Sequence, residues 1–464
     1  PLGPRPPPPG HPTMSPSSSR MLSRTEGAWL VVMSLVAVIA RLYRLDDPIT
    51  SGGWSFRFTQ TAYGIRSLVR GSLDPLTMEV PVLGPPWQIP YEFPLFQLSA
   101  AIIARLTSWD PVTAGRLVAT IAFAGVGVTT YALTKAWFGL RAAITAYAIV
   151  VWSAYGINWG SEVLIDYLSV ALCMWGTIAL HRSLARRRWR TTVLAIVPAA
   201  LGALTKATTA YSWVLIVGLA ALWLHRRDLT RVMQLVVWLG MALTPTLAWN
   251  RYADSVKAAN PHTGWLTSWN LNEHHFRSPR ELMEASQWRS LVEHSLEPSV
   301  GSVLIGVVFI TLAVLAPWSA RPARLVLALL IAPPLTFTGL YLAHDYYFIA
   351  IAPAFAMLAG VAVEVIRRFI AMQWKTAVSV PATVVAAALV VGLSWISPEG
   401  VENLNNSLPG SAAEAMRFDE VVEATSPDDR ILVVGMDWSP VFLYTVDRKG
   451  LMLRPNGSRP EEGE

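Results

Sequence analysis

Residues 162–206 read EVLIDYLSVALCMWGTIALHRSLARRRWRTTVLAIVPAALGALTK. The stretch holds two apolar runs, 164–182 and 191–205, which are joined by the basic cluster RRRWR at 186–190. An apolar run of roughly twenty residues spans a bilayer, and short loops rich in Lys and Arg remain in the cytoplasm. We therefore expect a transmembrane hairpin whose turn lies inside and whose acidic and lysine ends lie outside.

The same alternation continues along the chain, and the composition agrees with it. The chain has 464 residues, of which 53% are hydrophobic and only 15% are charged, and this excludes an ordinary soluble domain. The net charge of +6 does not indicate nucleic-acid binding, because most basic residues lie in short loops beside apolar runs. The single cysteine, Cys173, excludes a disulfide framework and a Cys-based metal site.

The predicted fold class is an all-α polytopic membrane protein with about eleven transmembrane helices. Arg20 and Arg24 precede the first apolar run, so we expect the N-terminus inside and the C-terminus outside. That first run lacks a small-residue cleavage site and is interpreted as an uncleaved span. The predicted spans are 28–43, 112–133, 141–157, 164–182, 191–205, 209–225, 231–250, 299–319, 324–343, 346–366 and 376–396.

One apolar stretch, Phe93 to Leu106, allows two threadings because it is short for a span. If it crosses the membrane, the basic clusters at 186–190, 225–227 and 367–368 all lie outside, against the positive-inside rule. If it lies flat at the outer interface, all three clusters lie inside. We adopt the interfacial interpretation.

Three regions follow from this threading. Residues 1–25 are predicted to be a disordered leader and residues 26–396 the transmembrane domain. Residues 397–464 are predicted to form a small extracytoplasmic α/β lobe. In this lobe RILVVGM (430–436) has the pattern of a buried strand, and WSPVFLYTV (438–446) that of a helix opening at a Ser-Pro pair.

The ends of the quoted hairpin carry the first candidate residues. Glu162 and Asp166 are four residues apart and share a face if both lie on one helix. Two nearby carboxylates can divide acid and base roles between them, although acids also favour helix N-termini for structural reasons. Lys206 is either a residue that extends its charge from the apolar region to the interface or a ligand for a phosphate group.

The two long outer loops, 44–111 and 251–298, hold further polar candidates, and the first is expected to contain interfacial helices. Glu92 lies in IPYEFPLFQ, just before the expected interfacial helix. It is either a helix-capping residue or a carboxylate at the mouth of a cavity. Arg57 and Gln60 lie on the same loop.

The segment HDYYFIAIAP places His344, Asp345 and Tyr346 at the outer start of a span. Aromatic belts at membrane interfaces explain the tyrosines, but they do not explain the histidine and the aspartate. His274 and His275 in the second outer loop are adjacent rather than four residues apart, which is a weak metal pattern. No metal ligand is assigned from the sequence, and a requirement for a divalent metal ion is left open.

Six segments together resemble the GT-C superfamily of polytopic glycosyltransferases, especially bacterial relatives of protein O-mannosyltransferases and of lipid A aminoarabinose transferases. Each motif is weak alone, but they occur in order over nearly the whole chain. They are FRFTQTAYGIRSLVRG (56–71), YEFPLFQLSAAIIARL (91–106), ALTKAWFGLRAAITAYAIVV (132–151), GALTKATTAYSW (202–213), HDYYFIAIAPAFAMLAG (344–360) and GMDWSPVFLYTVDRKG (435–450).

The resemblance implies transfer of a sugar from a polyprenyl-phosphate donor to a glycan, lipid or protein acceptor at the extracytoplasmic face of the plasma (inner) membrane. It implies that the reaction inverts the sugar and that an outer carboxylate is the general base. Many relatives carry an aspartate where Gln60 stands, and an amide cannot act as a base. By the resemblance, Asp166 matches the acid of the second outer loop, Glu92 the first-loop acid and Lys206 the donor-phosphate contact. Glu162 is a further catalytic candidate, and the further substrate-binding candidates are Arg57, Gln60, His344, Asp345 and Tyr346.

The alternative function is a non-catalytic membrane protein, either a GT-C-like subunit or a polyprenyl-lipid carrier. Transporters often show internal repeats with broken helices in matching halves, and the sequence shows no such repeat. No cofactor and no nucleic-acid partner are predicted.

Overall fold

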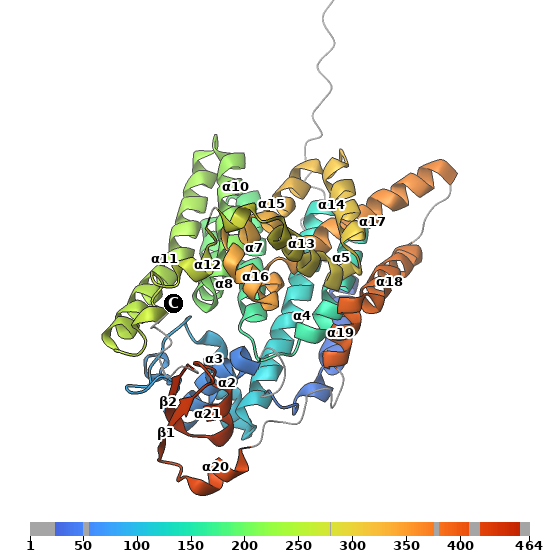
Figure 1. The fold of residues 1–464 in the computed structure, drawn as a ribbon. Coiled ribbons are helices and arrows are strands. Elements are labelled where there is room, and N and C mark those ends of the chain that lie inside the picture. Colours follow the sequence, from blue (N-terminus) through green and yellow to red (C-terminus); the bar gives the residue numbers. More distant parts are fainter. Residues whose placement is uncertain (1–23, 50–54, 279, 375–379, 408–417, 455–464) are drawn as a thin grey trace, which may run out of the picture.

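The computed structural model of the chain describes residues 24–49, 55–278, 280–374, 380–407 and 418–454. The leader predicted for residues 1–25 lies almost wholly outside this part of the chain. Figure 1 shows a bundle of helices with the C-terminal tail, including strands β1 (Arg430–Val434) and β2 (Lys449–Leu453), at one end. The prediction of a mostly helical membrane protein is confirmed. The candidate site is positioned by the elements at the same end of the bundle as the tail.

Four helical segments in the described residues are long and apolar enough to cross a membrane. They are α4 (Pro111–Phe138), α7 (Asp166–Arg186), the run Ala207–His225 and α11 (Leu229–Ala259). The other predicted spans correspond to further helices, several of them shorter. These are α1 (Arg24–Ile39), α5 (Leu140–Trp152), α8 (Trp189–Thr205), α14 (Val303–Leu315), α15 (Ala320–Thr336), α17 (Ala352–Trp374) and α18 (Val380–Ile396).

The span predicted at 141–157 is not one helix. Helix α5 ends at Trp152, and α6 (Ala154–Trp159) begins after an extended residue, Ser153. The Ser153 hydroxyl accepts a hydrogen bond from the backbone N–H of Gly156 at 3.3 Å. The serine therefore caps a new helix, and a sequence pattern based on apolar runs misses such a break.

The outer loop predicted at 251–298 is largely helical rather than irregular. Helix α11 continues to Ala259. The segment after it contains η4 (Gly264–Leu266), α12 (Asn272–His275), η5 (Glu281–Met283) and α13 (Ala285–Val300). Helix α13 packs against α14 and α18, so burial of one face stabilises a helix whose sequence is too polar to be recognised as a span.

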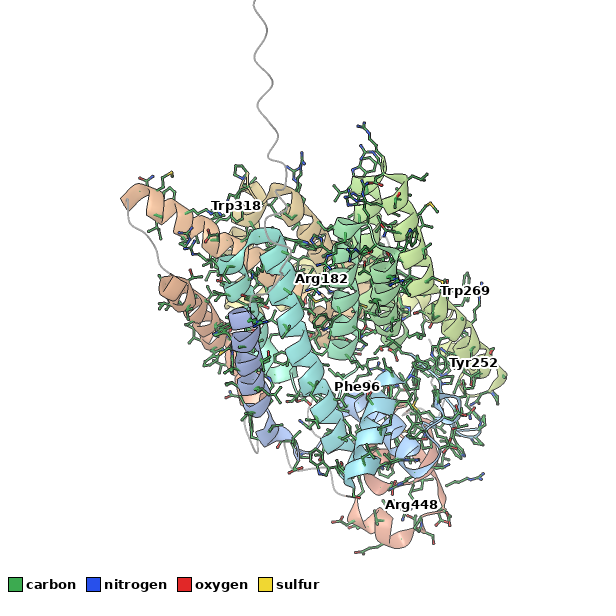
Figure 2. The ribbon with its side chains drawn as sticks, turned by 180° about the vertical axis from the view of Figure 1, so that it is seen from behind. Phe96, Arg182, Tyr252, Trp269, Trp318 and Arg448 are labelled. Atoms are coloured by element: carbon green, nitrogen blue, oxygen red, sulfur yellow. The ribbon has the colours of Figure 1, made fainter. Side chains whose placement is uncertain are left out.

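The basic connections meet at the end of the bundle away from the tail. Arg187 donates to Asp228 at 2.6 Å, which joins the turn after α7 to the turn before α11. The guanidinium of Arg368 lies 4.0 Å from the centre of the Trp318 ring, which joins the end of α17 to the turn after α14. In Figure 2, Trp318 lies far from Arg448 of the tail. The basic turn after α7 and the basic end of α17 therefore lie at the end of the bundle that is remote from the tail.

Two helices of the first outer loop lie beside the tail, at the opposite end. These are α2 (Ser55–Arg70) and α3 (Leu95–Thr107), and they pack against each other and against α4. Helix α3 covers all but the first two residues of the stretch 93–106, for which the sequence allows two threadings. It has only 13 residues, so at 1.5 Å per residue it extends about 20 Å, less than the roughly 30 Å hydrocarbon core of a bilayer.

The tail contains a parallel pair of strands, β1 and β2, joined by helix α21 (Val441–Val446). The predicted strand and helix are thus present. The expectation that the strand is buried is wrong, because Val433 is the only buried residue of β1. Strand β2 lies between β1 and the first outer loop, since Gly450 and Met452 donate to the carbonyls of Pro81 and Val82, each at 3.1 Å.

Candidate functional site

The hairpin of α7 and α8 brings Asp166 and Lys206 together. Cβ atoms built at Gly176 and Gly202 would lie 2.7 Å from the Ala199 side chain and 2.6 Å from the Cys173 sulfur. The two helices therefore approach more closely than larger residues allow. Asp166 is the first residue of α7, and Lys206 follows the last residue of α8. Both residues consequently lie at the same end of the hairpin.

Lys206 and Asp166 form a buried ion pair. The Nζ atom of Lys206 donates to Oδ1 of Asp166 at 2.5 Å, and the two side chains are only 3% and 1% exposed. The second carboxylate oxygen, Oδ2, has no hydrogen-bond partner among the residues that the structure describes. A buried carboxylate oxygen without a donor is costly for stability, and such an atom is available to accept a proton or a hydrogen bond from a bound molecule.

Two tyrosines of η6 (Asp345–Ala350) form an aromatic wall beside the lysine. The Nζ atom of Lys206 lies 3.8 Å from the ring centre of Tyr347 and 4.9 Å from that of Tyr346. Aromatic faces stabilise cations electrostatically, so the two rings favour the charged form of the lysine in addition to its pairing with Asp166. Tyr347 lies closer than the predicted Tyr346, and its position in the quoted HDYYF segment is the signal that could have identified it.

His344 stacks on the same wall. Its ring centre lies 5.2 Å from that of Tyr346 and 5.8 Å from that of Tyr347, with interplanar angles of 22° and 23°. Burial lowers the pKa of His344 to about 3, and nearby positive charges act in the same direction. The imidazole is therefore neutral near pH 7 and can donate or accept a hydrogen bond, but it adds no positive charge to the site.

Helix α2 supplies Arg57, the cation of a second cation–acid pair. Arg57 Nη2 donates to Glu92 Oε1 at 3.0 Å, and Arg57 Nη1 donates to Gln60 Oε1. Burial raises the pKa of Glu92, but Arg57 and then Lys206 outweigh it and hold the pKa below its usual value. Glu92 is therefore ionised at neutral pH, and it orients the arginine. The Arg57 Nε atom keeps no hydrogen-bond partner in the described chain.

The backbone fixes Glu92 beside the lysine. The N–H of Phe93 donates to the carbonyl of Leu204 at 3.1 Å, which ties the first outer loop to the last turn of α8. The indole N–H of Trp249 donates to the carbonyl of Tyr91 at 2.9 Å. These two bonds hold the residues on either side of Glu92, so its carboxylate stays close enough to Lys206 for their charges to interact.

Glu162 is separate from this cluster. The interpretation that it shares a helix face with Asp166 is wrong, because tight turns occupy residues 160–165 and α7 begins at Asp166. Glu162 instead lies 3.8 Å from Arg116 of α4, and both side chains are buried. Arg116 also donates to the carbonyl of Asp47 at 3.1 Å. These contacts join α4 to the turns before α7 and to the segment that follows α1.

Asp345 also faces a different environment. Burial raises the pKa of its carboxyl, and the charged groups that act on it are His294 and Glu402. Its backbone carbonyl accepts a hydrogen bond from the Tyr155 hydroxyl at 2.9 Å. The structure thus groups Asp345 with α13 and α19 (Pro398–Ser407), while its neighbour His344 joins the lysine site.

Metal ligation finds no support in the residues that the structure describes. No group of three or more His, Cys, Asp or Glu side chains converges there. The His274 ring lies 5.7 Å from that of His344 and 6.2 Å from that of His275, and these contacts are aromatic. The site therefore consists of two cations and two acids around a neutral, aromatic surface. Such a site suits an anionic group placed next to a polar hydroxyl.

The chain is similar to known proteins in sequence and in fold. Residues 90–249, which contain Glu92, Asp166 and Lys206, match the family described as dolichyl-phosphate-mannose-protein mannosyltransferase. No curated protein matches the sequence. The crystal structure of ArnT from Cupriavidus metallidurans in the apo state is 16% identical and covers 92% of this chain and 86% of its own, with a TM-score of 0.61.

Two further structures share the fold. ArnT from the same organism bound to undecaprenyl phosphate is 17% identical and covers 93% of this chain and 86% of its own, with a TM-score of 0.60. The oligosaccharyltransferase of Archaeoglobus fulgidus in complex with Zn and sulfate is 13% identical and covers 92% of this chain and 62% of its own, with a TM-score of 0.52. The predicted resemblance is therefore confirmed: the chain has the fold of GT-C glycosyltransferases over nearly its whole length.

Proposed function

We propose that this protein is a membrane glycosyltransferase that transfers a sugar from a polyprenyl-phosphate donor to an acceptor hydroxyl at the extracytoplasmic face. The observation that carries the proposal is the buried Asp166, whose Oδ2 has no partner among the described residues while Lys206 holds its Oδ1. The family match over the segment that contains both residues supports it. The ArnT structure bound to undecaprenyl phosphate supports a polyprenyl phosphate as the lipid of the donor.

The proposed reaction is a single displacement. Asp166 Oδ2 accepts the proton of the acceptor hydroxyl, and the hydroxyl oxygen attacks the anomeric carbon of the sugar from the side opposite the phosphate. The bond from that carbon to the phosphate oxygen breaks, and the lipid phosphate leaves with the electron pair. Attack from the opposite side inverts the anomeric configuration. The acceptor gains the sugar, and the polyprenyl phosphate is released.

Two cations stabilise the leaving phosphate in this scheme. A lysine ammonium has three donors, and Lys206 uses one of them for Asp166. Beside its contacts to Glu92 and Gln60, Arg57 has an Nε–H that finds no partner in the part of the chain that the structure describes. Both cations therefore retain donors for phosphate oxygens, where charge-assisted hydrogen bonds are strongest.

The same contacts rationalise Gln60. Its side-chain oxygen accepts from Arg57, so position 60 serves here as an orienting acceptor rather than as a base. Both acids are paired with a cation, but Asp166 is preferred as the base because its buried Oδ2 has no donor in the described chain, whereas Arg57 holds the pKa of Glu92 below its usual value. A weakly basic carboxylate is better suited to orientation than to proton transfer.

The experiment that tests the function compares lipid-linked sugars and outer glycans in cells with and without the gene, by mass spectrometry. A transferase predicts that one lipid-linked sugar accumulates and one glycan modification disappears on deletion. Restoring the gene should reverse both changes. If neither the lipid-linked sugars nor the outer glycans change on deletion, the result favours a non-catalytic subunit or lipid carrier over a transferase.

The orientation of the bundle gives a separate prediction. Arg188, in the basic turn after α7, should be cytoplasmic, and Trp269, which is 81% exposed in the segment after α11, should be outside. In intact cells, a membrane-impermeant thiol reagent should label the variant Trp269→Cys and not Arg188→Cys. After permeabilisation both variants should be labelled. Labelling of Arg188→Cys from outside would reverse the proposed topology.

Glu92 should matter mainly through Arg57. Changing Glu92→Gln keeps the shape and removes the charge that holds the guanidinium at 3.0 Å. We expect the donor KM to rise about tenfold, the equivalent of one charge-assisted hydrogen bond at about 1.5 kcal/mol. The measurement is transfer kinetics with purified enzyme over a range of donor concentrations. A loss of turnover at saturating donor, with an unchanged KM, would instead make Glu92 the base.

A further inference from the structure

Helix α2 connects the candidate site to the tail of the chain. Its first turns carry Arg57 and Gln60, which enter the site, and its last turns carry Arg66 and Arg70. Arg66 lies about 14 Å further along the helix axis than Arg57, at the α-helical rise per residue. A helix of this length is stiff. Weaker contacts at Arg66 and Arg70 in its last turns therefore also shift the first turn, which carries Arg57.

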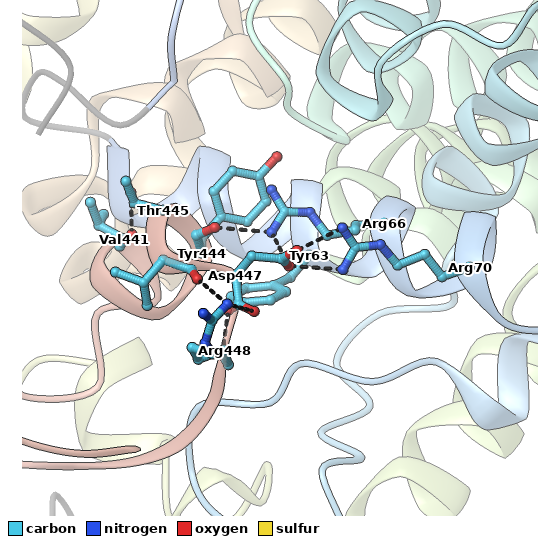
Figure 3. A network of polar contacts seen from close by, with 9 residues as sticks. Tyr63, Arg66, Arg70, Val441, Tyr444, Thr445, Asp447 and Arg448 are labelled. Atoms are coloured by element: carbon cyan, nitrogen blue, oxygen red, sulfur yellow. Dashed lines mark hydrogen bonds and ion pairs between the residues drawn. The ribbon is translucent and has the colours of Figure 1, made fainter. Parts of the chain in front are cut away.

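Asp447 of the tail binds two arginines in the last turns of α2 (Figure 3). Its Oδ1 accepts hydrogen bonds from Arg66 Nη1 at 3.0 Å and from Arg70 Nη1 at 2.8 Å. Its Oδ2 accepts from Arg70 Nη2 at 2.8 Å. The bidentate contact to Arg70 fixes orientation as well as distance. Arg66 also donates to the Tyr444 carbonyl at 2.9 Å and lies 3.6 Å from the centre of the Tyr444 ring.

Other contacts keep the tail in register with the first outer loop. The Tyr63 hydroxyl donates to the Arg448 carbonyl at 3.2 Å, and the rings of Tyr63 and Tyr444 meet edge to face at 5.1 Å. Lys449 Nζ lies 2.5 Å from Glu79 Oε2. With the backbone bonds from β2 to the first outer loop, these contacts fix the tail in both rotation and translation along α2.

Polar contacts and buried apolar side chains both join α2 to the tail, since Tyr63 of α2 and Tyr444 of the tail belong to the same buried core. A cavity of about 480 Å³ also lies between α2 and the tail, and its lining includes Arg66, Arg70, Glu79 and Asp447. The ion pairs beside this cavity add a fixed orientation that apolar packing alone does not give. On the other side of α2, Arg105 of α3 donates to the carbonyl of Leu68 at 2.6 Å. The last turns of α2 are thus held between α3 and the tail.

We infer that the tail is a positioning element for α2 and that Asp447 is a positioning residue, which aligns Arg57 and Gln60 with the Asp166–Lys206 pair. The consequence for catalysis rests on the proposed function, while the consequence for the mobility of α2 does not. Misplacement of a catalytic group by about 1 Å can cost up to about 10²-fold in rate. A residue on the surface, remote from the reacting atoms, therefore controls turnover.

Asp447→Asn is the test, and Asp437→Asn is its matched control. Both aspartates belong to the tail and both have left-handed backbone conformations, with φ of 54° and 52°. Asparagine tolerates this conformation, so neither change strains the backbone. Asp437 is 3.6 Å from Arg454 of the tail itself. Each variant loses one carboxylate charge, but only Asp447→Asn weakens the contacts of the tail with Arg66 and Arg70 of α2.

Two measurements on the full-length protein in lipid nanodiscs decide the outcome. Hydrogen exchange should rise across residues 55–70 in Asp447→Asn, including the turn that carries Arg57, and should stay at the wild-type rate in Asp437→Asn. Turnover at saturating donor should fall about tenfold in Asp447→Asn, with the thermal midpoint within the range of the control. Adding Arg70→Gln should cause little further loss, because the hydrogen bonds of Arg70 within the described chain are with Asp447 and are already lost.

Unchanged exchange at the Arg57 end of α2 in Asp447→Asn would overturn the inference, as would raised exchange with full turnover. If the wild-type protein shows no transfer at all, the proposed function fails, and the exchange measurement alone still decides whether the tail positions α2.

Discussion

Replacing Asp166 with asparagine is expected to lower sugar transfer by about 10²- to 10⁴-fold, the usual contribution of a general base. Asparagine has the same size, and its side-chain oxygen can still accept the hydrogen bond that Lys206 makes at 2.5 Å. It cannot take a proton from the acceptor hydroxyl at neutral pH. Chemistry should therefore be lost, while membrane insertion and donor binding are retained.

The measurement is single-turnover transfer with purified protein, alongside donor binding and thermal midpoint. Glu162→Gln is the natural comparison, since Glu162 is also a buried outer carboxylate but is paired with Arg116 at 3.8 Å. We expect that variant to lose stability and to keep its rate once the amounts of folded protein are matched. Near-normal turnover in Asp166→Asn, together with loss of turnover in Glu162→Gln, would show that Glu162 rather than Asp166 is the base.

The sequence predicts the central pair of the site for a simple topological reason. A basic turn between two spans places the other ends of both spans on one side of the membrane. Asp166 and Lys206 mark those ends, and the structure brings them together as a buried ion pair. The HDYYF segment is likewise placed at the outer end of a span by its position alone.

Features that depend on short local geometry or on distant pairing were not predictable. Glu162 falls in tight turns rather than on α7, and turn geometry depends on the hydrogen bonds made within it. Tyr347, rather than Tyr346, lies closest to Lys206 because of the path of η6. The contact of Asp447 with α2 joins residues far apart in the chain, and no periodic pattern in a single sequence encodes such a pairing.

The tail also alters how the first-loop motif is interpreted. From the sequence, Gln60 is a departure from the acid expected at that position. In the structure it is part of a chain of contacts in which Glu92 and Gln60 orient Arg57, and the tail holds the other end of the same helix. The site therefore combines the Asp166–Lys206 pair of the α7–α8 hairpin with Arg57 and Gln60 of α2.

Replacing Lys206 with methionine is expected to weaken donor binding by about 1.5–3 kcal/mol, or roughly 10- to 150-fold, the range for a hydrogen bond to a charged group. Methionine keeps much of the length of the side chain and removes its charge. It also leaves Asp166 buried without its partner, and breaking a buried pair in this way typically costs about 3–5 kcal/mol of stability. Affinity and stability must therefore be measured separately.

The double variant Lys206→Met with Asp166→Asn separates the two effects. Removing both charges should restore most of the thermal stability, because no buried charge is left unpaired, yet donor binding should stay weak. Lys257→Met is the matched control, since Lys257 is another buried lysine that pairs with an aspartate, Asp254, at 3.0 Å. It should lower stability without changing donor affinity. Donor binding can be followed by native mass spectrometry with a polyprenyl phosphate. Wild-type affinity in Lys206→Met would show that the lysine serves only to neutralise Asp166, and phosphate recognition would then fall to Arg57.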